Sequence, residues 1–377
     1  MPASRRRSAR RARGGLSAAG AIAVFGTLAC GREPETRAAA ARAEPAAEFL
    51  AVAGDSTYWV TSGPGGVRVR SAPLFLTRWD GRLSDVYVVD DGVRFEAAEF
   101  TSARVYRRDL LTGDSALVAG DGEVPALAAR YAAAHPDARP LDDDEDPESD
   151  AALVAEHGIG LVAVHGPYVT LDLRTTVDAP DGAHREALRR RVVDLRTGRP
   201  ASLGALFGVA APEALVAAGR HAFAAAVATL DALRPAAADD SAGARARAAL
   251  ASLRFDADNF GLATLDGAPA VQFVARGADA DGVVTLALPA LPVAGEPAWW
   301  TADVRPLLPA AAPDAARLLA RVLGGAPSGP ASADPPEELV RLDRPPADPA
   351  LRRALRRAFD ERTLDDAVTT SVARRRR

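Results

Sequence analysis

The clearest structural pattern lies in residues 168–199, which read YVTLDLRTTV (168–177), DAPDGA (178–183) and HREALRRRVVDLRTGR (184–199). Apolar and polar side chains alternate along the first segment, as in a half-buried β-strand; Val169, Leu171 and Leu173 share one side. DAPDGA is typical of a turn, because Asp, Pro and Gly favour a tight reversal of the backbone. The chain then enters a strand at His184 and reaches a second hairpin tip at Arg196–Arg199. The stretch predicts antiparallel β-structure.

The rest of the folded chain continues this pattern and adds helices. From Ser56 to Gly120, short runs rich in β-branched and aromatic residues are separated by turn segments such as Asp90–Gly92. Further strands are expected at 152–156, 160–164, 168–177, 260–274 (as a hairpin) and 283–288. Helical spacing of apolar residues predicts helices at 124–134, 212–233, 244–253, 313–323 and 349–360. The sequence therefore predicts an α+β fold in which antiparallel sheets pack on a few helices.

Residues 1–29 differ in character from the rest of the chain. Six arginines precede residue 14, and residues 14–29 carry no charge. An uncharged segment of this length suits a secretory signal and is shorter than the roughly 20 residues of a transmembrane helix. It ends in Thr27-Leu28-Ala29-Cys30, which resembles a bacterial lipobox, and Cys30 is the only cysteine. We predict a lipoprotein signal peptide at 1–29 with lipid attached to Cys30; an ordinary cleaved signal peptide and an uncleaved anchor are the alternatives.

Composition narrows the classes of function. A hydrophobic fraction of 48% and a charged fraction of 25% are those of a globular protein. A single cysteine excludes a disulfide framework, an iron–sulfur cluster and a cysteine-rich zinc site. All 46 basic residues are arginine, which we attribute to GC-rich codon usage. Removal of residues 1–29 would change the formal net charge from −4 to −10, and an acidic chain of this kind is not expected to bind nucleic acid.

The predicted domains follow from shifts in composition. Residues 30–50, rich in Ala, Glu, Arg and Pro, are expected to form a flexible tether. A mostly-β subdomain is expected at 51–140. Seven acids in residues 142–150 predict a solvated linker, because the spaced ligands and the glycine turn of a calcium loop are absent. An α+β domain is expected at 151–310, followed by a helical extension and basic tail at 311–377.

Three blocks in the second domain resemble a known bacterial family. They are Gly182-Ala183-His184, then Val193–Gly198 followed by Ser202–Phe207, then Phe255 to Phe273 with Phe260, Leu262 and Asp266-Gly267. From Tyr168 to Pro309 the chain resembles the extracytoplasmic domain of unknown function found in the lysozyme-sensing anti-sigma factor RsiV and beside the catalytic domain of the peptidoglycan deacetylase PdaC. The resemblance implies a curved antiparallel sheet against one or two helices, and a domain that binds or senses rather than catalyses.

Two clusters are the best candidates for chemistry or ligand binding. Asp178, Asp181 and His184 could ligate a metal or set up a general base, or they could simply close a turn. Trp299-Trp300 could present aromatic rings to a carbohydrate or a partner, or could plug the core. No nucleophile elbow, Walker motif or dinucleotide fingerprint occurs in the sequence, so we predict no catalytic residue, no metal site and no cofactor.

These observations predict an exported, membrane-anchored bacterial lipoprotein that faces the periplasm or the cell exterior. Its α+β module is expected to bind a cell-envelope component such as peptidoglycan, or a secreted protein. The alternative is an envelope enzyme that modifies peptidoglycan or another polysaccharide, and a purely structural lipoprotein is a third possibility.

Overall fold

The computed structural model describes residues 47–375, except 54–55, 64–65, 121, 143–152, 233–240, 266–267, 280–281, 301–338 and 344. The predicted signal peptide, Cys30, the acidic run from residue 143 onward and the predicted helix at 313–323 lie outside the described residues. Helices and mainly antiparallel sheets confirm the predicted α+β class. In the part of the chain that the structure describes, no helix combines the length and apolar character needed to cross a bilayer.

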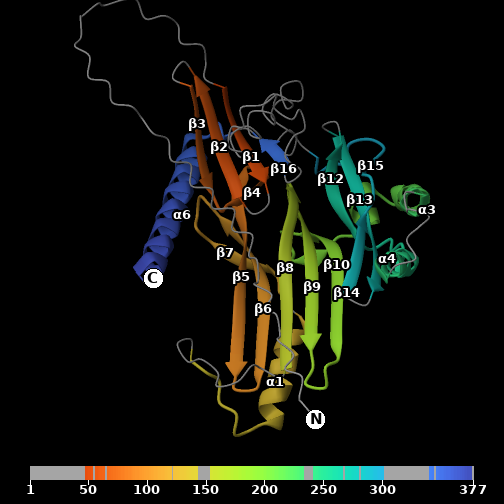
Figure 1. The fold of residues 1–377 in the computed structure, drawn as a ribbon. Helices are drawn as coiled ribbons and strands as arrows, with labels where there is room; N and C mark the ends of the chain where they lie inside the picture. Colours follow the sequence, from red (N-terminus) through yellow and green to blue (C-terminus); the bar gives the residue numbers. More distant parts are fainter. Residues whose placement is uncertain are drawn as a thin grey trace, which may run out of the picture.

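A long central sheet organises the molecule (Figure 1), and its described strands follow the order β11-β10-β9-β8-β6-β5-β4, with β7 paired to β6. The strands are β4 (Phe75–Trp79), β5 (Arg82–Phe95), β6 (Ala98–Asp109), β7 (Ser115–Ala119), β8 (Leu153–His165), β9 (Tyr168–Asp178), β10 (His184–Asp194) and β11 (Arg199–Pro200). The β6–β8 pair is parallel. The sheet therefore takes strands from both sides of the predicted linker at 142–150.

Three local predictions need correction. Asp90–Gly92 is not a turn but lies within β5, where Gly92 pairs with Thr101 of β6. The two strands expected at 152–156 and 160–164 form one strand, β8, because Gly158 and Gly160 continue the pairing with β9. Residues 47–50, which the sequence placed in the tether, belong to β1, and Phe49 and Leu50 are buried.

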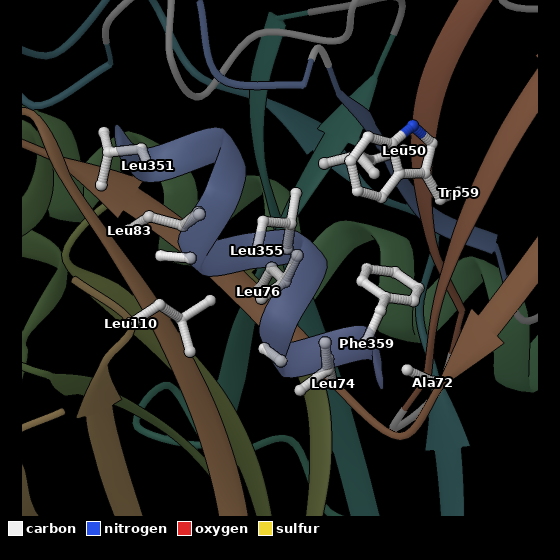
Figure 2. Packing of buried hydrophobic residues seen from close by; sticks show 12 residues of the cluster. Leu50, Trp59, Ala72, Leu74, Leu76, Leu83, Leu110, Leu351, Leu355 and Phe359 are labelled. Atoms are coloured by element: carbon white, nitrogen blue, oxygen red, sulfur yellow. The ribbon is translucent and has the colours of Figure 1, made fainter. Parts of the chain in front are cut away.

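A smaller sheet joins the two ends of the described chain. Its order is β16-β1-β2-β3, from Leu339–Asp343, Ala47–Ala53, Ser56–Gly63 and Gly66–Ala72. Helix α6 (Pro349–Arg375) begins where the predicted helix at 349–360 begins and packs Leu351, Leu355 and Phe359 into the core that Figure 2 shows. These residues recur every four positions and so share one face of the helix. The other members of this core are Leu50, Trp59, Ala72, Leu74, Leu76, Leu83, Leu110, Ala354 and Ala358.

A third sheet, with order β12-β13-β14 and β15 paired to β13, stands beside β10 (Figure 1). Its strands are Phe260–Leu265, Ala268–Asp279, Gly282–Ala287 and Leu291–Pro292. Helices α2 (Leu203–Phe207), α3 (Ala211–Ala232) and α4 (Ser241–Ser252) belong to the same part of the chain, and α3 and α4 confirm the helices predicted at 212–233 and 244–253. Gly219 lets α3 pack closely against β13, because a Cβ at this position would lie 2.8 Å from the Phe273 ring.

Side chains, rather than strand pairing, hold this third sheet to the edge of β10. Asn259 Oδ1 accepts a hydrogen bond from the Arg190 backbone N–H at 2.6 Å, and Arg276 donates to the Leu188 carbonyl at 3.1 Å. Val283 N–H donates to Glu186 Oε2 at 2.9 Å. These bonds occupy backbone groups that an edge strand would otherwise expose. They fix β13 and β14 beside β10.

Helix α1 (Glu123–Ala134) confirms the helix predicted at 124–134 and lies against the lower end of the central sheet (Figure 1). Its Val124 is buried with Phe95 and Phe100, and the Tyr131 ring stands 5.1 Å from that of Phe95. These contacts fix α1 against β5 and β6 at this end of the central sheet.

Candidate functional site

A groove runs over the face of the central sheet formed by β8, β9 and β10. It consists of two hollows of about 510 Å³ and 870 Å³ that share His157, Thr175 and Ala187. The smaller hollow is also lined by Val118, Ala119, Gly120, Leu171, Leu173, Arg189, Arg191, Val193, Gly198, Pro200 and Arg276. The larger adds Gly122, Glu123, Leu127, Arg130, Val177, His184, Arg185, Glu186, Ala278, Gly282 and Val283, so that α1 and the β13–β14 hairpin form its walls.

Strand alternation explains which side chains reach the groove. In the antiparallel β9–β10 pair, Leu173 lies opposite Arg189 and Leu171 lies opposite Arg191. Side chains of directly paired residues project from the same face of a sheet. The groove floor is therefore aliphatic on β9, while β10 places two guanidinium groups next to those leucines.

The groove arginines are poorly neutralised. Within the described residues, neither Arg189 nor Arg191 forms an ion pair, and the same holds for Arg130 and Arg185. Burial, followed by the positive charge of Arg189, lowers the pKa of the Arg191 guanidinium, while the carboxylates of Asp258 and Asp256 act in the opposite direction. Only Arg276, among the arginines of the smaller hollow, has a described partner, with Nη2 2.8 Å from Asp256 Oδ2. The smaller hollow is thus a positively charged site on an apolar floor.

His157 lies where the two hollows meet. Its Nδ1 is 3.0 Å from Thr175 Oγ1, and burial lowers the pKa of the imidazole, which favours the neutral ring at neutral pH. Gly122, at the start of α1, lies so close that a Cβ would stand 3.1 Å from the ring. The histidine therefore contributes a neutral polar group rather than a further charge.

The predicted cluster of Asp178, Asp181 and His184 forms the tip of the β9–β10 hairpin. His184 Nδ1 lies 2.6 Å from Asp178 Oδ1, whereas Asp181 accepts a hydrogen bond from the Ala183 N–H at 3.0 Å and closes the turn. The His184 side chain is 46% exposed and is the only one of the three that lines the groove. Across the described ranges, no group of three or more His, Cys, Asp and Glu side chains is arranged to hold a metal ion.

The predicted aromatic pair lies on the other side of the central sheet. Trp299 Nε1 donates to the Leu206 carbonyl at 2.8 Å, and its ring meets Tyr168 edge-on at 5.1 Å. Trp300 is 4% exposed and stacks on His165. Of the two predicted roles, this geometry corresponds to a core plug.

The sequence contained a signal for the groove arginines that our prediction did not use. Arg189, Arg190 and Arg191 are consecutive in a strand, so two of them must share the face opposite the third. The apolar stripe of Val169, Leu171 and Leu173 on the neighbouring strand indicates that one face is apolar. Which arginines would face the leucines depends on the strand register, which the sequence alone did not define.

Neither a protein-family model nor a curated protein matches this chain.

Proposed function

We propose that this chain is an exported, membrane-anchored bacterial lipoprotein whose folded part is a binding module, with the groove over β8, β9 and β10 as its binding site. The observation that carries the proposal is the pair Arg189 and Arg191, which lie beside leucines and have no described ion-pair partner. The groove gathers positive charge although the whole chain has a net charge of −4. The ligand is therefore anionic where it meets these arginines.

The energetics of burying charge support this proposal. Burial is the largest influence on the Arg191 guanidinium and lowers its pKa, and Asp258 and Asp256 oppose this without forming an ion pair with it. Arg189 is exposed and has no described ion pair. Arginines with perturbed or unpaired charge in a hollow are candidates for a binding role.

The membrane attachment is a separate part of the proposal and rests on the sequence around Cys30. Lipid on this residue would hold the module at the membrane surface, where it meets peptidoglycan, envelope lipids and secreted proteins. Replacement of Cys30 by alanine should move the protein from the membrane fraction to the soluble fraction when cells are fractionated. Membrane attachment that is unchanged by Cys30→Ala would refute the lipid anchor.

The binding function can be tested with two envelope probes, purified peptidoglycan sacculi and vesicles made from total envelope lipids. We expect the full-length chain to co-sediment with at least one of them at low ionic strength. The double variant Arg189→Glu/Arg191→Glu should lower the retained fraction at least tenfold. The matched control is Arg220→Glu/Arg353→Glu, which makes the same charge change at exposed positions outside the groove. Absence of co-sedimentation with both probes, or equal loss in both double variants, would contradict the proposal.

The alternative, an enzyme that modifies peptidoglycan or another polysaccharide, has one supporting observation. His184 lies at the groove wall with Asp178 2.6 Å from its Nδ1, an arrangement in which a carboxylate could orient an imidazole as a general base. Incubation of sacculi with the full-length chain should then release soluble fragments, and His184→Ala should abolish the release. Intact sacculi after incubation with the unaltered chain would exclude this alternative for that substrate.

A further inference from the structure

Resting on the binding function proposed above, we propose that the groove binds a single-chain anionic amphiphile, with its carboxylate or phosphate head on Arg189 and Arg191 and its acyl chain along the aliphatic floor. Three features of the groove support this ligand: the chemistry of the lining, the spacing of the arginines, and the charges that set the direction of the acyl chain.

The apolar part of the lining is aliphatic. Among the described residues of both hollows there is no Phe, Tyr or Trp, so sugar rings and nucleobases find no stacking surface. The apolar members are Val118, Ala119, Leu127, Leu171, Leu173, Val177, Ala187, Val193, Ala278 and Val283. Leu171, Val118 and Val193 are buried in the core beneath the groove, so the partly exposed members supply the apolar surface. Such side chains favour a hydrocarbon ligand because each buried methylene is removed from water. The floor therefore points to an acyl chain rather than a glycan.

The two arginines are spaced for one head group. Residues i and i+2 of a strand point to the same face and are about 7 Å apart, so the guanidinium groups of Arg189 and Arg191 can converge on a single anion. Guanidinium groups bind carboxylate and phosphate by paired N–H···O hydrogen bonds. Arg276 stands on the wall of the same hollow, and Asp256 holds it in place.

The distribution of acids sets the direction. The smaller hollow is lined by Arg189, Arg191 and Arg276 and by no described Asp or Glu, although Asp256 pairs with Arg276 and acts with Asp258 on Arg191. The larger hollow is lined by Arg130 and Arg185 together with Glu123 and Glu186. An anionic head is favoured in the smaller hollow by this difference. The chain then passes over Ala187, which both hollows share, toward Leu127 and Val177. The larger hollow, of about 870 Å³, holds the end of the chain.

The proposal is tested by titration calorimetry of the full-length chain with amphiphiles below their critical micelle concentrations. The probes are dodecyl phosphate, laurate, octyl phosphate and, as a cationic control, dodecyltrimethylammonium. We expect saturable one-to-one binding of dodecyl phosphate or laurate, at least tenfold weaker binding of octyl phosphate or none, and no one-to-one binding of the cation. Preference between phosphate and carboxylate distinguishes a phospholipid-derived ligand from a fatty acid.

Two variants connect binding to the groove. Arg189→Gln/Arg191→Gln should weaken binding of the dodecyl anion at least tenfold, while Arg220→Gln/Arg353→Gln, outside the groove, leaves it unchanged. Ala187→Trp, at an exposed position over which the chain passes, should remove the advantage of twelve carbons over eight. Urea unfolding midpoints equal to that of the unaltered chain confirm that each variant is folded.

Several outcomes would overturn the inference: no one-to-one binding of either dodecyl anion, equal binding of the cation, or equal binding by Arg189→Gln/Arg191→Gln. If sacculi still bind through the same arginines, only the amphiphile assignment fails and the binding module stands. If sacculi, vesicles and amphiphiles all fail to bind, both proposals fail.

Discussion

The two faces of β10 use the same residue type in opposite ways. On the face toward β12 and β13, Arg190 donates from Nε and Nη2 to the two carboxylate oxygens of Asp172, at 2.8 and 2.7 Å, and from Nη1 to Gln272 Oε1 at 3.1 Å. Its side chain is 14% exposed. On the opposite face, Arg189 and Arg191 line the groove and have no described ion pair. Of the three consecutive arginines, Arg190 is therefore engaged by protein side chains, whereas Arg189 and Arg191 can interact with a ligand.

This difference separates a structural role from a binding role. Arg190 joins β9, β10 and β13, because its partners Asp172 and Gln272 belong to β9 and β13. Its bidentate geometry leaves little capacity for another anion. Arg189 and Arg191 make no comparable bonds, so their removal should affect a ligand more than the fold. This assignment can be tested by measuring both the free energy of unfolding and ligand binding for substitutions at these three positions.

Substitution of Arg190 is expected to have the largest effect on the free energy of unfolding. Arg190→Ala should lower the free energy of unfolding by about 3–4 kcal/mol, because it leaves the Asp172 carboxylate partly buried without its partner. Arg189→Ala, the matched control one residue away, should change it by less than about 0.5 kcal/mol. Urea denaturation of the full-length chain measures both. Equal destabilisation by the two substitutions would show that the two faces do not differ in the way proposed.

Asp85 is the reverse of Arg191, because here the buried group is an anion and the two groups near it are arginines. Asp85 is fully buried, its Oδ1 accepts a hydrogen bond from the Phe75 N–H at 3.2 Å, and Oδ2 lies 3.8 Å from Arg108 Nη2 and 3.6 Å from Arg362 Nη2. Burial raises the pKa of this carboxyl to about 6, although both arginines and the Phe75 N–H act to lower it. Two arginines therefore do not fully offset the desolvation of one carboxylate.

Because its pKa is higher in the folded than in the unfolded chain, Asp85 binds more protons in the folded state between about pH 4 and pH 6. Its contribution to stability is therefore greatest at low pH and falls as the pH rises through this window, by about 3 kcal/mol for a shift of about two pKa units. Asp85→Asn should remove this slope. The measurement is the difference in unfolding free energy between the two proteins at pH 4, 5, 6 and 7. A constant difference across that range would contradict the prediction.

The elements that the sequence predicted are those whose pattern is local. The alternation of Val169, Leu171 and Leu173 predicted strand β9, and apolar spacing located α3, α4 and the start of α6. The parallel β6–β8 pair and the β1–β16 pair, in which Leu50 faces Asp343, join segments far apart in the chain. Such pairings depend on tertiary packing, which no short window of sequence contains.

The candidate site was predicted only in part for the same reason. His184 could be singled out because Asp178 lies six residues away, and the structure brings the two into contact. The groove, however, needs β9, β10, α1 and the β13–β14 hairpin together, and Arg276 reaches it from a strand more than 80 residues after Arg189. Trp299 and Trp300 are local in sequence, yet the sequence could not decide between their two predicted roles. Adjacent aromatic residues look alike in sequence whether they are buried or exposed.

The smallest expected effect on the free energy of unfolding is at the tip of the β9–β10 hairpin. His184 and Asp178 are in contact at 2.6 Å, closer than Arg190 to Asp172, yet both side chains are about half exposed, at 46% and 54%. Exposed pairs gain little because water already solvates both groups and salt screens them. His184→Ala should therefore change the free energy of unfolding by less than about 1 kcal/mol, several-fold less than Arg190→Ala, when both are measured by urea denaturation in the same buffer. A loss at His184 as large as that at Arg190 would mean that distance, not burial, determines what a polar side-chain contact contributes in this hairpin.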